Sequence, residues 1–66
     1  MTQITQNQGR YQAELYRLAL ARYMGESDAN MEAFIEAAAE AFNVPTDKVQ
    51  RDVGIKSRNF FIAANR

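Results

Sequence analysis

A cluster of basic and amide side chains in the C-terminal third of the chain could contact nucleic acid. Lys48, Gln50 and Arg51 lie in one short stretch, and Lys56 and Arg58 follow it. Arg pairs bidentately with guanine, Gln pairs with adenine, and a Lys ammonium suits a phosphate. We therefore expect Lys48 and Arg51 to hold phosphate or guanine and Gln50 to contact a base. Lys56 and Arg58 would steady the contact with the DNA backbone.

An acidic row in the middle of the chain indicates an alternative kind of partner. Its members recur at every fourth position: Asp28, Glu32, Glu36 and Glu40. Such a row lies along one side of a helix and is usually solvated, although it can also dock a basic protein surface. Tyr16 and Tyr23 supply apolar surface on an earlier segment. The alternative function is thus a helical protein-binding adaptor or inhibitor, of phage or plasmid accessory type, using Glu32, Glu36 and Glu40 or these tyrosines.

No set of side chains in the sequence is suited to catalysis or metal binding. The 66 residues include no Cys and no His, which removes thiolate and imidazole groups as nucleophiles, bases or metal ligands. Ser27 and Ser57 therefore have no imidazole partner, and the three Gly form no phosphate-binding cluster. We expect no enzymatic activity, no cofactor and no metal site.

The charges are segregated along the chain. Eight basic and eight acidic residues cancel overall. Residues 1–24 carry three Arg and one Glu (+2), residues 25–47 carry six acids and no bases (−6), and residues 48–66 carry five bases and one Asp (+4). One face of a small domain can then attract phosphate while another face repels it.

Helical periodicity indicates which elements position these side chains. Apolar spacing predicts helices at about 10–24, 28–43 and 46–53, and a further short helix at 58–65. The stretch FFIA within the last range could instead form a short strand. Residues 1–9 are polar and aperiodic and are expected to be a flexible arm, although Thr2 or Thr5 could begin the first helix early. The expected fold is all-α, a small bundle of three to four helices in residues 10–66.

A sharp corner is predicted between the second and third helices. Asn43 can adopt the left-handed conformation of a helix exit, and Val44 can fill the corner. Pro45 cannot continue the first helix, whereas Thr46 or Asp47 could cap the next one. This arrangement is typical of a helix-turn-helix, although such a corner can also serve packing alone.

The third helix is too short to be stable without tertiary packing. Val49 and Val53 give it one apolar side. Gly54 followed by Ile55 predicts its end, with Ile55 covering the terminus. Asp52 could pair with Lys48 or with Lys56, and the sequence does not decide between them.

Residues 37–53, AAAEAFNVPTDKVQRDV, carry a resemblance to a known family. The residues of the first helix and turn that match are Ala39, Glu40, Phe42 and Val44. The residues of the second helix that match are Val49, Arg51, Asp52 and Val53. The segment resembles the helix-turn-helix of the DeoR family of bacterial transcriptional repressors, typically A-E-x-F-x-V-S-x-x-T-V-R-R-D-L. The resemblance implies a regulator of transcription that binds duplex DNA in the major groove, and we expect it to act as a homodimer.

The first predicted helix carries more apolar surface than one small partner helix covers. Tyr16, Leu20 and Tyr23 form a second apolar row beside the row that contains Leu15 and Leu18. Either the helix is central to the core, with its Tyr hydroxyls reaching the surface, or one row is a homodimer seam. No apolar run reaches the roughly 20 residues of a membrane span, and no signal peptide is evident, so a cytoplasmic protein is expected.

Overall fold

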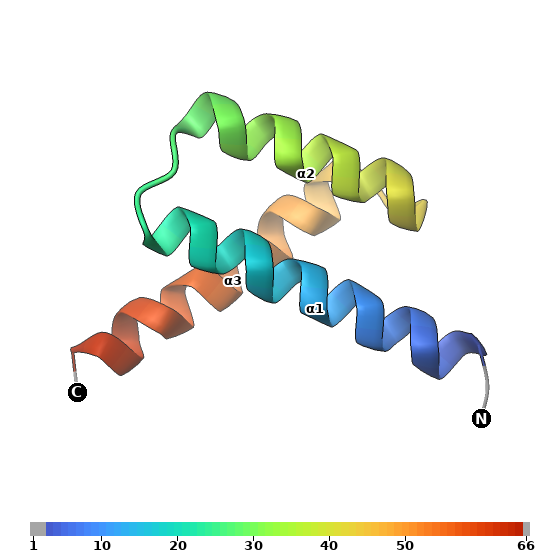
Figure 1. Cartoon of the computed structure of the whole chain (residues 1–66), viewed down its shortest axis with the longest axis horizontal. Helices are drawn as coiled ribbons and strands as arrows, with labels where there is room; N and C mark the ends of the chain where they lie inside the picture. Colours follow the sequence, from blue (N-terminus) through green and yellow to red (C-terminus); the bar gives the residue numbers. More distant parts are fainter. Residues whose placement is uncertain (1–2, 66) are drawn as a thin grey trace.

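The computed structural model describes residues 3–65, which form three helices and no strand. α1 spans Gln3–Tyr23, α2 spans Asp28–Phe42 and α3 spans Thr46–Ala64. α1 and α2 run antiparallel side by side, and α3 crosses behind them so that its C-terminal half extends past α1 (Figure 1). The prediction of an all-α fold is confirmed.

Left-handed residues end the first two helices where the sequence predicted it. Gly25 follows α1 with a φ of 98°, and the N–H of Glu26 donates to the carbonyl of Ala21 at 3.0 Å. Asn43 follows α2 with a φ of 55°, and the N–H of Val44 donates to the carbonyl of Ala39 at 3.0 Å. These bonds satisfy carbonyls that have no partner inside the helix.

A serine cap begins α2. The Ser27 hydroxyl accepts a hydrogen bond from the Asn30 backbone N–H at 3.2 Å, and Asp28 places an acid in the first turn. Both features stabilise the N-terminal end of the helix, where backbone N–H groups lack partners. The predicted second helix is confirmed, with its end one residue earlier than expected.

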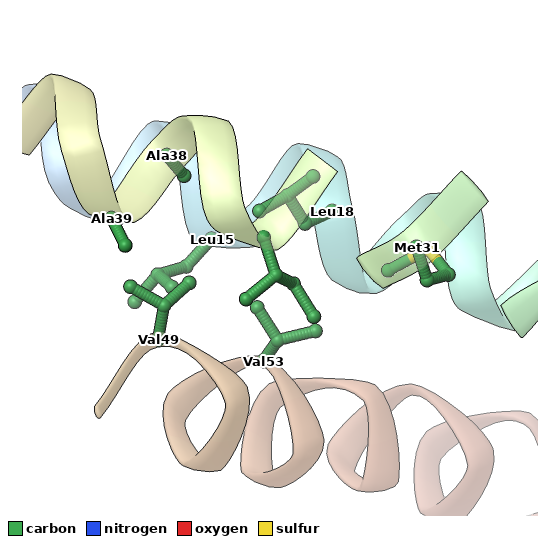
Figure 2. Packing of buried hydrophobic residues seen from close by; sticks show 8 residues of the cluster. Leu15, Leu18, Met31, Ala38, Ala39, Val49 and Val53 are labelled. Carbon is green, nitrogen blue, oxygen red and sulfur yellow. The ribbon is translucent and has the colours of Figure 1, made fainter. Parts of the chain in front are cut away.

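The core lies where the three helices meet. Figure 2 shows Val49 and Val53 pointing from α3 into the side chains of α1 and α2, and both are 0% exposed. Burying a valine contributes about 1.5–3 kcal/mol, so these two residues hold α3 in place. The buried apolar residues are Leu15, Leu18, Ala19, Met31, Ile35, Ala38, Ala39, Val49 and Val53.

α3 continues through Gly54, so the predicted stop there is wrong. Gly54 lacks the positive φ of Gly25, and buried Ser57 extends the stripe of Val49 and Val53 beyond it. Packing on both sides of the glycine offsets its low helix propensity. The predicted helix at 58–65 is therefore the C-terminal part of α3, and the alternative of a strand at FFIA is wrong. Ile55, expected to cover a helix end, is instead 57% exposed in the middle of α3.

Both remaining differences concern the starts of helices. α1 begins at Gln3, inside the segment expected to be an arm, because no proline interrupts residues 3–9 and a helix that is already formed extends at little cost. Residues 1 and 2, including the alternative start at Thr2, lie outside the described residues. Pro45 is the N-cap of α3 and offers no side-chain hydrogen bond, so neither Thr46 nor Asp47 caps it. The Pro45 carbonyl accepts from the Lys48 N–H instead, at 3.1 Å.

None of the helices within residues 3–65 combines the length and the apolar character needed to cross a membrane.

Replacing Gly54 with Ala should stabilise the fold by about 0.5–1 kcal/mol, because the glycine is helical and an added Cβ would meet no atom within 4 Å. Urea unfolding followed by far-UV circular dichroism would measure the change. Gly25→Ala is the matched control: its surroundings are equally open, but its φ of 98° disfavours any Cβ. This control should lose about 1–2 kcal/mol. A destabilised Gly54→Ala variant would contradict a continuous α3.

Candidate nucleic-acid interface

The buried side of α3 determines which residues face away from the other helices. Val49, Val53 and Ser57 lie against α1 and α2. By the 3.6 residues of a helical turn, the opposite side carries five residues spaced by four or three positions. All five are exposed. We call this set the outward stripe of α3; its members are Asp47, Arg51, Ile55, Arg58 and Ile62.

Two arginines supply the positive charge of the outward stripe. Arg51 and Arg58 lie about 20° apart around the axis and about 10 Å apart along it, given a rise of about 1.5 Å per residue. Within the part of the chain that the structure describes, the ion pairs are Lys48 with Asp52 and Arg17 with Glu14. Both guanidinium groups of the stripe therefore remain available to an external anion, and a guanidinium can bind phosphate or guanine through two hydrogen bonds.

Asp52 is turned away from the stripe by contacts to α1 and along α3. The Tyr11 hydroxyl donates to Asp52 Oδ2 at 2.9 Å, and Lys48 Nζ donates to the same oxygen at 2.9 Å. The Lys48 ammonium also lies 5.2 Å from the centre of the Tyr11 ring, within range of a cation–π contact. These three residues form the Asp52 cluster. Of the two predicted partners of Asp52, the structure therefore shows Lys48 and not Lys56.

The pKa shifts in the Asp52 cluster follow from these contacts. The hydrogen bond from Lys48 lowers the pKa of the Asp52 carboxyl, and the hydrogen bond from Tyr11 adds to that effect. Burial raises the pKa of Tyr11 to about 12, with a further contribution from its hydrogen bond to Asp52. At neutral pH the cluster therefore holds an ionised carboxylate beside an ammonium, and its net charge is zero.

The five residues predicted to contact DNA divide into separate groups. Arg51 and Arg58 share the outward stripe, and exposed Lys48 lies about 60° from Arg51 with its ammonium on Asp52. Gln50 is exposed but lies about 100° from Arg51. Lys56 is half-buried and lies about 140° from Arg51 on the other side of the helix. Of the five residues, the structure thus brings together Arg51 and Arg58, and neither takes part in the ion pairs described above.

The stripe also contains residues that the sequence had not assigned to a site. Asp47 lies about 40° from Arg51, so its carboxylate opposes phosphate binding at the start of α3. Ile55 lies between the two arginines, and Ile62 follows one two-turn repeat later. The spacing 51, 55, 58, 62 is visible in the sequence, but the helix end predicted at Gly54 separated Arg51 from the residues that follow it.

The residues of the alternative site lie on other surfaces. Glu32, Glu36 and Glu40 are exposed along α2. Tyr16 on α1 is 54% exposed and forms one row with exposed Leu20 and with exposed Met24, which directly follows the helix. We call these three residues the α1 row.

Aromatic residues in the C-terminal halves of α1 and α3 join these two helices. The Phe60 ring centre lies 5.2 Å from that of Tyr16 and 6.0 Å from that of Tyr23, while Phe61 lies 5.0 Å from Tyr23. Phe60 and Phe61 therefore pack against tyrosines and help to hold α3 against α1. Tyr23 is partly buried by these contacts, which leaves it less available than Tyr16 to a partner.

An open hollow of about 190 Å³ lies beside the Asp52 cluster, lined by Gln8, Tyr11, Phe42, Val44 and Lys48. Ligand pockets typically enclose about 300–1,000 Å³, so this hollow is small for a cofactor. Residues 3–65 contain no group of three carboxylates or other ligating side chains placed to hold a metal ion.

The chain has no match among protein-family models, curated proteins or solved structures.

Replacing Tyr11 with Phe should destabilise the fold in a pH-dependent way. The folded-state pKa of Tyr11, about 12, exceeds its ordinary value of 10.0, so the neutral phenol is favoured by folding. Its contribution is complete below pH 10 and is lost as the pH rises through about 12. The difference in unfolding free energy between wild type and Tyr11→Phe should shrink over that interval, as measured by urea unfolding at several pH values. Tyr16→Phe is the matched control, and the same pH dependence in both variants would contradict the assignment.

Proposed function

We propose that this chain is a small helix-turn-helix DNA-binding protein that regulates transcription, with α3 entering the major groove. The observation that carries the proposal is the outward stripe, where Arg51 and Arg58 project to solvent while the Asp52 carboxylate is neutralised elsewhere. Free guanidinium groups on an exposed helix face suit phosphate and guanine contacts.

The connection between α2 and α3 supports the helix-turn-helix assignment. Three residues, 43–45, separate the helices, and Asn43 has the left-handed backbone of a tight turn. Helix-turn-helix motifs join their helices by three or four residues and place the second helix in the groove. Buried Ala39, Val49 and Val53 lie at positions that resemble the apolar positions of the DeoR pattern.

The proposed contacts are fewer than the sequence predicted. Arg51 and Arg58 bind phosphate or guanine. Lys48 contributes less, because its ion pair with Asp52 offsets part of its positive charge. Gln50 would reach a base only at the edge of the contact. Lys56 is left out, because it is half-buried and points to another side of α3.

A module with two free arginines needs a second copy for useful affinity. The α1 row of Tyr16, Leu20 and Met24 supplies the proposed homodimer seam, since it is exposed apolar surface along and at the end of the helix predicted to dimerise. Two α3 helices would then bind two half-sites of a palindromic operator.

Arg51→Ala and Arg58→Ala should each weaken binding to duplex DNA. The loss should be about 1–3 kcal/mol for a guanine contact, or a salt slope reduced by about one for a phosphate contact. Fluorescence anisotropy on random-sequence duplexes at about 50–200 mM salt measures both quantities. Lys48→Ala is unsuitable as the main test, because it also leaves Asp52 without its ammonium partner.

Two variants control this experiment for overall charge. Arg22→Ala removes the same charge from an exposed position at the end of α1 and should leave affinity nearly unchanged. Asp47→Asn removes a negative charge from the stripe and should tighten binding. Equal weakening by Arg22→Ala and Arg51→Ala would contradict the placement of DNA on the stripe.

Leu20→Gln should shift the protein from dimer to monomer in sedimentation equilibrium, because it places a polar group at the centre of the α1 row while keeping helix propensity. Phe34→Gln is the control, since Phe34 is similarly exposed but lies on α2. A wild-type protein that is monomeric at every concentration would exclude the dimer.

The second candidate function is the helical protein-binding adaptor. The exposed α1 row and the exposed acids of α2 favour it, because they offer apolar and acidic contacts to a basic protein surface. Reversing the charges of Glu32, Glu36 and Glu40 distinguishes the candidates. It should abolish capture of a protein partner if the adaptor function holds, and leave DNA affinity intact or stronger if the DNA-binding function holds.

A further inference from the structure

Ile55 occupies the centre of the outward stripe, between its two arginines. It lies about 6 Å along the axis from Arg51 and about 4.5 Å from Arg58, and about 40° and 60° from them around it. Its side chain is 57% exposed. An apolar side chain at this position adds nothing to a contact with phosphate, so it points to an apolar feature on the ligand.

The major groove of B-DNA offers one apolar group on its base edges, the C5-methyl group of thymine. We propose that Ile55 contacts a thymine methyl group while Arg51 and Arg58 hold the adjoining guanine or phosphate groups. This inference rests on the proposed function and specifies its ligand: duplex DNA with an A·T pair facing the middle of the stripe. The gain arises from burying two apolar surfaces together.

Ile62 has the same exposure and the same stripe but a different position along α3. It is 54% exposed and lies about 24 Å along the axis from the start of the helix, whereas Ile55 lies about 14 Å from it. Recognition helices contact bases mainly through their N-terminal residues, so Ile55 is better placed for a base contact than Ile62. The C-terminal half of α3 extends past α1 (Figure 1), and Ile62 lies in the last turn of that helix.

The different positions of Ile55 and Ile62 along α3 make it possible to distinguish a contact with thymine from the docking of a protein helix. A protein partner on the stripe would bury Ile55 and Ile62 together, because they are seven residues apart on the same line. Contact with a thymine methyl involves Ile55 alone.

The test compares an alternating dA-dT duplex with a dA-dU duplex of the same length, which differ only in the thymine methyl groups. At about 50 mM salt, wild-type protein should bind the thymine duplex about three- to fivefold more tightly, the factor expected for burying about one methyl group. Ile55→Ser should abolish this preference, and Ile62→Ser should retain it. Both substitutions are at exposed positions, so folding is expected to be kept and is checked by circular dichroism.

Three results would overturn the inference. Equal binding of the two duplexes by wild type would exclude methyl contact while leaving the proposed DNA binding in place. A preference lost equally in Ile55→Ser and Ile62→Ser, or kept in Ile55→Ser, would exclude the assignment to Ile55. Absence of binding to these duplexes and also to the random-sequence duplexes would overturn the proposed function and this inference with it.

Discussion

The rotation of α3 about its own axis is set by two valines, and the rest of the molecular surface depends on that rotation. Val49 and Val53 are fully buried between α1 and α2, and Ser57 continues the same stripe toward the C-terminus. Close packing allows little adjustment around such residues. Once they are placed, the helical repeat directs Arg51, Ile55 and Arg58 away from the protein. The face that α3 presents to a partner is therefore centred on these residues.

The Asp52 cluster determines the sign of the charge next to that face. Asp52 is adjacent in sequence to Arg51, and a free carboxylate there would repel phosphate. Tyr11 and Lys48 hold it against α1 instead, at 2.9 Å each. The same arrangement engages the Lys48 ammonium, so one base is withdrawn along with one acid. The outward stripe keeps two arginines and Asp47, which leaves a modest positive charge. A small positive surface on a chain with zero net charge explains why the proposed DNA contact needs two copies.

Periodicity in the sequence predicted the helices, but it did not predict which side chains lie together on the surface of the folded protein. The apolar spacing of residues 28–42 and the left-handed exits at Gly25 and Asn43 are local features, so they could be recognised without a structure. The helical conformation of Gly54 could not be predicted in this way. A glycine ends a helix only where the chain requires a positive φ, and here packing on both sides keeps the residue helical. That error concealed the line from Arg51 to Ile62. The separation of Lys56 from Arg51 follows from the continuity of α3, whereas the choice of which of the two faces solvent depends on the rotation of the helix, which only the tertiary packing determines.

The most direct test of this account is a titration of isotope-labelled protein with duplex DNA at low salt, followed by two-dimensional NMR. We expect chemical-shift changes concentrated on the outward stripe, at the amides of Arg51, Ile55 and Arg58 and at the guanidinium groups. Residues on the far side of the same helix, such as Lys56, should change little. Shifts confined to the acidic row of α2 or to the α1 row, or no shifts at any DNA concentration, would contradict it.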